Sequence, residues 1–344
     1  MKNTYIYFRD DFTSAEFEFD PSDPTCLDHV GYTYPGRVFY HLEKMVPNQG
    51  LTIYLTGWTV HRLPTYGPKT IVFIMQDEWS REPRYRDKVG AIFHACSATP
   101  SSLQALGPGG PLENTMNILQ YFRNIFRRDG LPGRIISLLK KGLGANLAPV
   151  YEFPLGYFAN EPVEFIPFQD RPYLLSFAGS VEHKAASRIL ARPKELARSR
   201  MTQALNELKH KRPELKIHLK TTKNYKDSIG KTDSYNQTMM QSKFCLIPRG
   251  ANLETFRYYE AIRFGCIPIV ESYPKLPFYD DAPLVHIHRW SDLESTLDRE
   301  LQDEAKLVQK HQQVLEWWHR ICSESQVAKA VLGHFQTGTV VYGQ

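Results

Sequence analysis

The sequence predicts an α/β protein with two Rossmann-like domains that face each other across a cleft. Three observations predict this fold. Apolar runs of strand length alternate with helical or loop segments, this alternation occurs twice, and a proline-rich stretch separates the two series. That stretch runs from Phe158 to Pro172, so we expect domains over 1–160 and 161–344, with the last helix able to pack back on the first domain. A chain of 344 residues exceeds what one core usually supports.

The expected elements of the first half are four strands and one long helix. The strands are predicted over Thr4–Phe8, Leu51–Leu55, Thr70–Met75 and Ala91–Cys96. Met116–Asp129 has the spacing of an amphipathic helix. Near-continuous apolar strands separated in this way are typical of a parallel sheet that is covered on both faces.

The second half repeats the alternation with five strands. These are predicted over Tyr173–Gly179, Leu215–Leu219, Phe244–Ile247, Cys266–Val270 and Pro283–His288. Helices are predicted over Lys184–His210, around Tyr235–Ser242, after Ser291 as an N-cap, and from Ala305 to Phe335. A further helix within Glu254–Gly265 ends at Gly265.

Composition excludes several classes of protein. A hydrophobic content of 42% with 23% charged residues is that of a globular protein, and a net charge of +5 is too low for non-specific nucleic-acid binding. Neither a signal peptide nor a membrane span is visible, so we expect a cytoplasmic protein, or one of the Golgi lumen if an N-terminal anchor precedes the chain. The five cysteines show no paired spacing and are expected to be reduced.

One basic and apolar segment, 123–141, has two interpretations. It interleaves arginines and lysines with Ile135, Ile136, Leu138 and Leu139. Such a segment suits peripheral contact with an anionic membrane. The interpretation that we favour from the sequence is that its apolar face packs on the core while its charges are solvated.

The most informative unit runs from Ser242 to Phe278. A strand ends at Pro248-Arg249-Gly250, and a helix and a second buried strand follow. A helix that begins after such a turn offers free N–H groups and a positive dipole end to an anion, and Arg249 adds a full charge. A diphosphate would bind well at this loop.

The same unit resembles the exostosin-like family of inverting glycosyltransferases. The matching pieces are SKFCLIPRG, ETFRYYEAIRFGCIPIV and LPF, preceded by PLGY at Pro154, RPYLLSFAGS at Arg171, and Arg188. The helix most resembles the ribitol xylosyltransferase branch. The resemblance implies a two-domain fold of the GT-B type, a UDP-sugar donor, a glycan acceptor and a β-linked product. UDP-xylose is the favoured donor, and galactose and glucuronic acid donors occur among wider relatives. Those relatives usually carry a membrane anchor, so a microbial or viral cytoplasmic enzyme is expected here.

The expected donor site lies at the strand ends of the second domain. Its residues are Gly179, Ser180, Arg188, Pro248, Arg249, Gly250, Thr255, Arg257 and Glu260. Arg249 and Arg188 are chosen to stabilise the leaving diphosphate, although Arg188 has an equal claim to be an ordinary surface arginine. The resemblance implies that Glu260 holds the ribose hydroxyls, and an ion pair with Arg257 or Arg263 is the competing interpretation.

The catalytic base is expected in the first domain. Glu78, and after it Asp77, follow the apolar strand at Thr70, where burial against Trp79 would raise a carboxyl pKa. His94 and His61 are alternatives, although a lone histidine in an apolar strand is more often a core residue. No Asp-x-Asp occurs, so neither a metal nor another cofactor is expected.

Two other functions compete with this prediction. A non-catalytic nucleotide-sugar-binding scaffold would keep the fold and lack the base. An oxidoreductase is disfavoured, since neither half has a Gly-x-Gly-x-x-Gly after its first strand.

Overall fold

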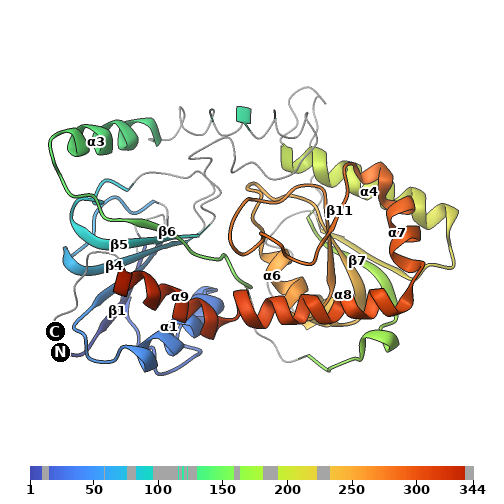
Figure 1. Ribbon diagram of the computed structural model, residues 1–344, viewed down its shortest axis with the longest axis horizontal. Helices are drawn as coiled ribbons and strands as arrows, with labels where there is room; N and C mark the ends of the chain where they lie inside the picture. Colours follow the sequence, from blue (N-terminus) through green and yellow to red (C-terminus); the bar gives the residue numbers. More distant parts are fainter. Residues whose placement is uncertain are drawn as a thin grey trace. The chain divides into compact units, whose positions relative to one another are not determined.

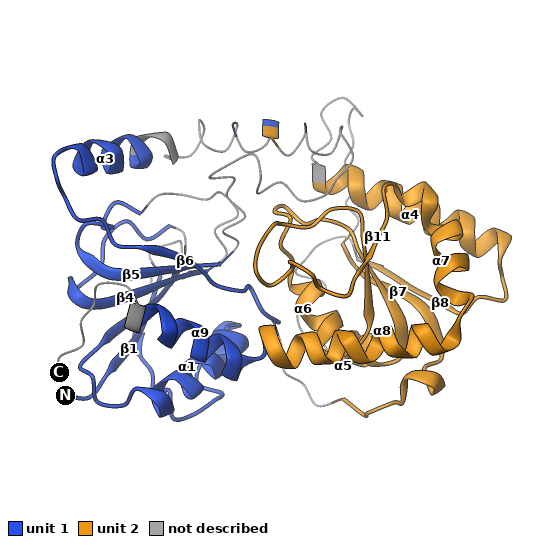
Figure 2. Ribbon diagram, viewed as in Figure 1, with its two compact units in different colours: residues 1–102, 119–158, 322–344 blue, residues 103–118, 159–321 orange. Residues whose placement is uncertain are grey.

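The computed structural model describes residues 1–9, 15–57, 59–75, 83–95, 115, 118–119, 122, 130–158, 163–180, 193–222 and 233–337. The chain divides into two units (Figure 2). Unit 1 comprises Met1–Ser102, Leu119–Phe158 and Cys322–Gln344, and unit 2 comprises Leu103–Ile118 and Ala159–Ile321.

Unit 1 is built on a six-stranded sheet. In spatial order its strands are β2 (Ala15–Glu18), β1 (Thr4–Arg9), β3 (Thr52–Gly57), β4 (Gly67–Met75), β5 (Val89–His94) and β6 (Val150–Glu152). Strand β2 pairs antiparallel with β1, and all other neighbours are parallel. The four predicted strands are therefore confirmed, whereas β2 and β6 were not predicted.

The helices of unit 1 cover the sheet unequally. They are α1 (Thr33–Met45), α3 (Gly130–Gly142) and α9 (Glu324–Thr337), with a 3₁₀ turn at Asp28–Val30. Helices α1 and α9 pack together on one face (Figure 1). There the stacked rings of Phe73 and Phe93 meet Phe39 of α1 and Phe335 of α9. The other face carries a second apolar cluster around Tyr54, Val72 and Ile92.

Unit 2 contains a five-stranded, wholly parallel sheet. In spatial order its strands are β11 (Val285–His286), β10 (Ile267–Val270), β9 (Ser242–Ile247), β7 (Tyr173–Ser180) and β8 (Ile217–Thr222). All five correspond to predicted strands. Buried side chains fill β9 and β10, including Leu246 and Ile269. Continuous burial along both strands explains why their sequences are apolar without alternation.

The helices of unit 2 are α4 (Pro193–Lys211), α5 (Asp233–Met240), α6 (Phe256–Arg263), α7 (Leu293–Leu301) and α8 (Glu304–Trp317). Short turns occur at Phe168–Asp170 and Trp290–Asp292, and a π-helical turn spans Trp318–Cys322 between the units. The predicted α/β fold with two Rossmann-like domains, the pair that the GT-B type comprises, is confirmed.

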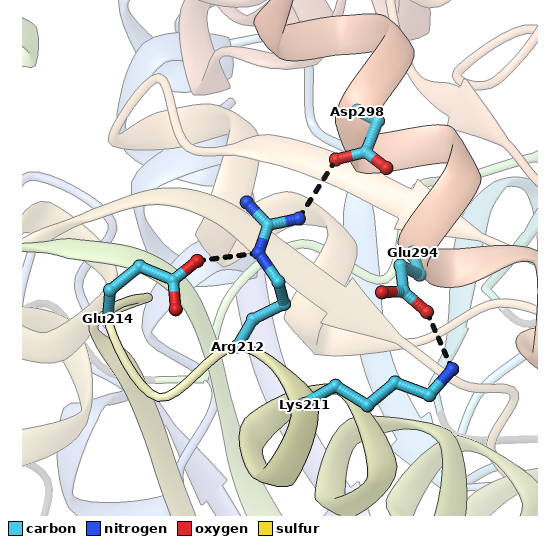
Figure 3. A network of polar contacts seen from close by, with 5 residues as sticks. All are labelled: Lys211, Arg212, Glu214, Glu294 and Asp298. Carbon is cyan, nitrogen blue, oxygen red and sulfur yellow. Dashed lines mark hydrogen bonds and ion pairs between the residues drawn. The ribbon is translucent and has the colours of Figure 1, made fainter.

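Surface ion pairs join α4 to α7 (Figure 3). Lys211 Nζ lies 2.9 Å from Glu294 Oε2, and Arg212 contacts Glu214 and Asp298 at 2.5 and 3.2 Å. Because these pairs are exposed to solvent, they add little to the stability of the unit. Burial of Trp290 and Leu297 does more to hold this edge of unit 2 together.

Three expectations about helices are wrong. The closing helix is interrupted, because α8 ends at Trp317 and α9 begins at Glu324. Ser291 is not an N-cap; it lies within the 3₁₀ turn, and α7 starts at Leu293. The apolar side chains of α3 face outward instead of packing on the core. For the predicted helix at 116–129, most positions fall outside the described residues.

Two further observations concern cysteines and membranes. Cys26, Cys245, Cys266 and Cys322 are free thiols, and Cys96 lies outside the described residues. In the part of the chain that the structure describes, every helix is too short or too polar to cross a lipid bilayer.

Candidate functional site at the switch point of unit 2

The strand order of unit 2 contains a topological switch point. Counted along the chain, the order β8-β7-β9-β10-β11 reads 2-1-3-4-5, the order of flavodoxin-like folds. The chain passes from β7 to β8 on one side of β7, and the next strand, β9, lies on the other side of β7. The two connections therefore run in opposite directions from β7, and the switch point lies between β7 and β9. Ligands of open α/β sheets bind beyond the carboxyl ends of the strands at such a point. In unit 1 the described order β2-β1-β3-β4-β5-β6 also places β2 and β3 on opposite sides of β1, but β2 runs antiparallel to β1.

Two predicted site segments meet at this point. Gly179 and Ser180 end β7, and Pro248-Arg249-Gly250 follows β9, the strand beside it. The sequence-based expectation that both strand ends border one crevice of unit 2 therefore agrees with the strand order.

Arg257 links the two strands across the switch point. It lies in the first turn of α6, which follows β9, and its Nη2 donates to the carbonyl of Ala178 in β7 at 2.7 Å. Its guanidinium also covers the ring of Phe177 at 4.7 Å from the centroid. Glycine is needed at 179 because a Cβ there would lie only 2.4 Å from Arg257 Nη2.

A partly buried polar cluster forms behind Arg257. Tyr235 of α5 hydrogen-bonds Glu260 and Arg257, and both Glu260 and Tyr235 interact electrostatically with the guanidinium. Burial raises the pKa of Tyr235 well above its usual value, and the charge of Glu260 adds to this. Tyr235 is therefore a neutral donor to the Glu260 carboxylate.

Glu260 has one partner that the sequence allowed, Arg257, and one that the sequence did not indicate, Tyr235. It is buried beside Arg257, which matches the competing ion-pair interpretation. A carboxylate has about four acceptor positions, so contact with Tyr235 and Arg257 does not by itself exclude further donors. The ribose-binding role of Glu260 stays a prediction.

The loop between β9 and α6 keeps Arg249 close to the backbone. Arg249 is 5% exposed, and its Nη2 and Nε lie 3.4 Å from the carbonyls of Ala251 and Gly250. Bonds of this length are weak. Tyr259 donates to Glu254 Oε1 at 2.5 Å, so the end of the loop is fixed to the helix that follows.

Thr255 is the N-cap residue of α6 and makes no side-chain cap bond. Its Oγ1 is buried without a hydrogen-bond partner. Such an atom normally has a partner, since burial without one costs about 1–3 kcal/mol. A phosphate oxygen at the start of α6 would accept from this hydroxyl, and the positive end of the helix dipole would favour its charge.

Ser180 is hydrogen-bonded to α4 of the same unit. Its carbonyl and Oγ both accept from Arg198 Nη1 of α4, at 2.5 and 3.0 Å. These bonds attach α4 to the end of β7. The hydroxyl proton of Ser180 remains available, because Oγ acts only as an acceptor here.

Other candidates lie elsewhere or outside the described residues. Glu78, Asp77 and Arg188 belong to segments that the structure does not describe. His94 is buried at the end of β5. Within the described residues, no group of three or more His, Cys, Asp or Glu side chains could hold a metal ion.

The site contains two residues that the sequence did not single out. Tyr235 and Glu254 each hydrogen-bond with a residue of the α6 region. Glu254 lies where the predicted helix begins, close to the phosphate loop, so its position could be recognised from the sequence. Tyr235 lies in α5, far from the motif in sequence, and no pattern distinguishes it.

Known proteins match the part of the chain that contains the switch-point site. Residues 157–331, half of the chain, match the family described as the RXYLT1 C-terminal domain. Human ribitol-5-phosphate xylosyltransferase 1 is 22% identical over 231 residues, which cover 60% of this chain and 49% of that protein. A Caenorhabditis elegans exostosin-1 homolog is 47% identical over 38 residues, covering 11% and 10%. The chain spans about half the length of the ribitol xylosyltransferases that it matches.

A solved structure also matches the chain. It is the pneumococcal O-GlcNAc transferase GtfA in complex with UDP and GlcNAc, with 11% identity, a TM-score of 0.39, and coverage of 88% of this chain and 59% of that one. The family match contains all the described residues of the switch-point site, from Gly179 to Glu260. The chain therefore belongs to the RXYLT1 C-terminal domain family of exostosin-like glycosyltransferases.

Proposed function

We propose that the chain transfers a sugar from a UDP-sugar to a hydroxyl group of a glycan acceptor, with inversion to a β-linkage and without a metal ion. UDP-xylose is the favoured donor, and UDP-galactose and UDP-glucuronic acid are the alternatives. The observation that supports the proposal best is the switch-point site, where Arg257 of α6 donates to the end of β7 and lies beside Glu260.

The donor would be held by the elements around α6. Its diphosphate fits the start of α6, where Thr255 Oγ1 is buried without a hydrogen-bond partner, the helix dipole is positive and Arg249 lies in the preceding loop. Its ribose fits the Glu260 carboxylate, which Tyr235 orients from the other side. Departure of UDP leaves negative charge on the diphosphate, and this positive site stabilises it without proton transfer.

The acceptor hydroxyl must lose a proton as the sugar is transferred. We assign this base role to Glu78, and to Asp77 if Glu78 proves dispensable. The first acceptor to test is ribitol 5-phosphate, because the human and zebrafish relatives are named for that substrate.

The experiment is a panel of UDP-, GDP- and CMP-sugars, in which released nucleotide is measured with and without the acceptor. We expect release from one UDP-sugar and weakened binding of UDP to the Arg249→Ala variant. Arg212→Ala is the matched control, because Arg212 is an exposed arginine of the same unit. UDP binding without turnover on any donor or acceptor would favour the scaffold function. No nucleotide binding at all would refute the proposal.

A further inference from the structure

Helix α3 exposes its apolar face and buries its small and polar face, whereas a helix that packs on a core does the reverse. Small or polar residues at Gly133, Ser137 and Lys140, spaced by four and three positions, are buried or half-buried. The opposite face is aliphatic and exposed, with Leu138 at 69%, Leu139 at 62% and Leu143, just after the helix, at 87%. Ile135 and Ile136 belong to the same exposed face, at 46% and 36%.

The polar side of α3 is fixed to unit 1. Lys140 Nζ lies 2.7 Å from Asp87 Oδ1 and 3.3 Å from the carbonyl of Arg84. This attachment determines which side of the helix faces outward. An apolar stripe of this kind on a folded domain indicates an interaction surface, because isolated exposed leucines are ordinary but contiguous ones are not.

The charge around α3 is positive. No Asp or Glu occurs from residue 130 to 151, whereas Arg134, Lys140 and Lys141 all lie in the helix. Asp87, a carboxylate that contacts α3, is paired with Lys140 and has exposed basic neighbours at Arg84 and Lys88. Lysines and arginines on the polar side of a helix, with leucines and isoleucines on the other, are the arrangement of a helix that lies in a membrane interface.

We propose that α3 binds the surface of membranes that contain anionic phospholipid, with Ile135, Leu138, Leu139 and Leu143 entering the acyl boundary. The exposed face contains no aromatic side chain, hydrogen-bond donor or arginine, which are the usual anchors of a protein interface. An aliphatic stripe with surrounding cations matches the two components of a bilayer surface, the acyl chains and the anionic headgroups. This inference does not depend on the proposed transferase activity.

The test is co-sedimentation of the full chain with phosphatidylcholine vesicles that contain or lack phosphatidylserine. We expect the wild type to bind the anionic vesicles more tightly. The Leu138→Ser/Leu139→Ser variant should lose at least about tenfold in binding, because two exposed leucines supply most of the insertion. Phe165→Ser is the matched control, since Phe165 is 71% exposed in unit 2. Thermal unfolding shows whether each variant is folded.

A second measurement reports insertion directly. In a Leu139→Trp variant, tryptophan emission should shift to the blue on addition of anionic vesicles and should be quenched by brominated lipid. Equal binding by wild type and the double-serine variant would overturn the proposal. The proposal would also be overturned if the wild type did not bind vesicles and instead formed a dimer that the double-serine substitution dissociates. The exposed face of α3 would then bind a second copy of the chain. UDP-xylose hydrolysis by the double-serine variant should be unchanged, which separates this proposal from the transferase.

Discussion

Substitution of Gly179 by alanine should destabilise unit 2 through Arg257. The new Cβ would lie 2.4 Å from Arg257 Nη2, whereas ordinary contacts begin at 3.4 Å, so the guanidinium must move. Such a movement removes the 2.7 Å hydrogen bond to the Ala178 carbonyl and disturbs the contact with the Phe177 ring. No other described side chain lies so close to this Cβ.

The cost can be estimated from these contacts. A hydrogen bond from a charged donor contributes about 1.5–3 kcal/mol, and a cation–π contact about 0.5–1 kcal/mol. The φ of 159° at Gly179 is one that alanine rarely adopts, so the entropy gain of an unstrained glycine-to-alanine change does not offset this loss. The net loss in the free energy of unfolding should be at least about 2 kcal/mol, which corresponds to a fall of at least roughly 4–8 °C in Tm for a unit of this size.

Urea denaturation followed by tryptophan fluorescence measures this loss. Trp290, Trp317 and Trp318, three of the five tryptophans, lie in unit 2, so the signal reports mainly on that unit. The control is Gly333→Ala, because a Cβ at Gly333 meets no atom within 4 Å. This control should change stability by less than about 1 kcal/mol.

A double-mutant cycle tests whether the effect passes through Arg257. Arg257→Met removes the guanidinium and keeps most of the stem. If the alanine acts by displacing that group, Gly179→Ala should cost much less in the Arg257→Met background than alone. Effects that add within about 0.5 kcal/mol would refute this reasoning, because independent sites behave in that way.

Four further predictions concern the proposed reaction and pH. Arg249→Ala should weaken UDP binding at least about tenfold by calorimetry, since a charge near the diphosphate is lost; unchanged affinity would remove Arg249 from the site. Glu78→Gln should abolish turnover and preserve UDP binding, and near wild-type turnover would exclude Glu78 as the base. EDTA should leave donor turnover unchanged, whereas a loss that Mg²⁺ or Mn²⁺ restores would show that a metal is required. Burial lowers the pKa of His311, which stacks on Phe168, so the unfolded chain takes up a proton first as the pH falls. Stability should therefore decline below pH 6.5, and His311→Gln should flatten that decline in pH-dependent urea melts.

The strands of both sheets were predictable because of how they are buried. Strands such as β4 and β9 have helices or loops on both faces, so their sequences are continuous apolar runs. The unpredicted strands lie at the edges. β2 reads Ala-Glu-Phe-Glu and pairs only with β1, and β6 has three residues and pairs only with β5. Neither of these two strands has a buried side chain among its described residues, so neither produces a pattern; β11, also at an edge, was predicted because it lies in an apolar run.

The break between α8 and α9 was hidden for a related reason. Both helices have one apolar face, and the residues between them continue the helical spacing. Contacts with α1 accompany the break between α8 and α9. The Cys322 carbonyl accepts from Tyr34 OH of α1 at 2.6 Å, and α9 packs on α1. A carbonyl that bonds to a residue 288 positions away cannot be anticipated from local periodicity.

The same limit explains what the sequence could and could not say about α3 and Glu260. Helical spacing shows that α3 has an apolar stripe, but it does not show on which side the domain lies; the contact between Lys140 and Asp87 decides that. For Glu260, the spacing offers arginines at 257 and 263 as partners, whereas Tyr235 reaches it from a helix that precedes β9. The sequence pattern identifies candidate site residues, because a motif and a position on a helix both depend on residues that are near one another in the chain. Their partners depend on strand order, and at the switch point that order brings α5, α6 and β7 together. A variant at Tyr235 therefore probes the fold of the site more directly than any residue of the motif: Tyr235→Phe should leave the loop intact and loosen only the orientation of Glu260.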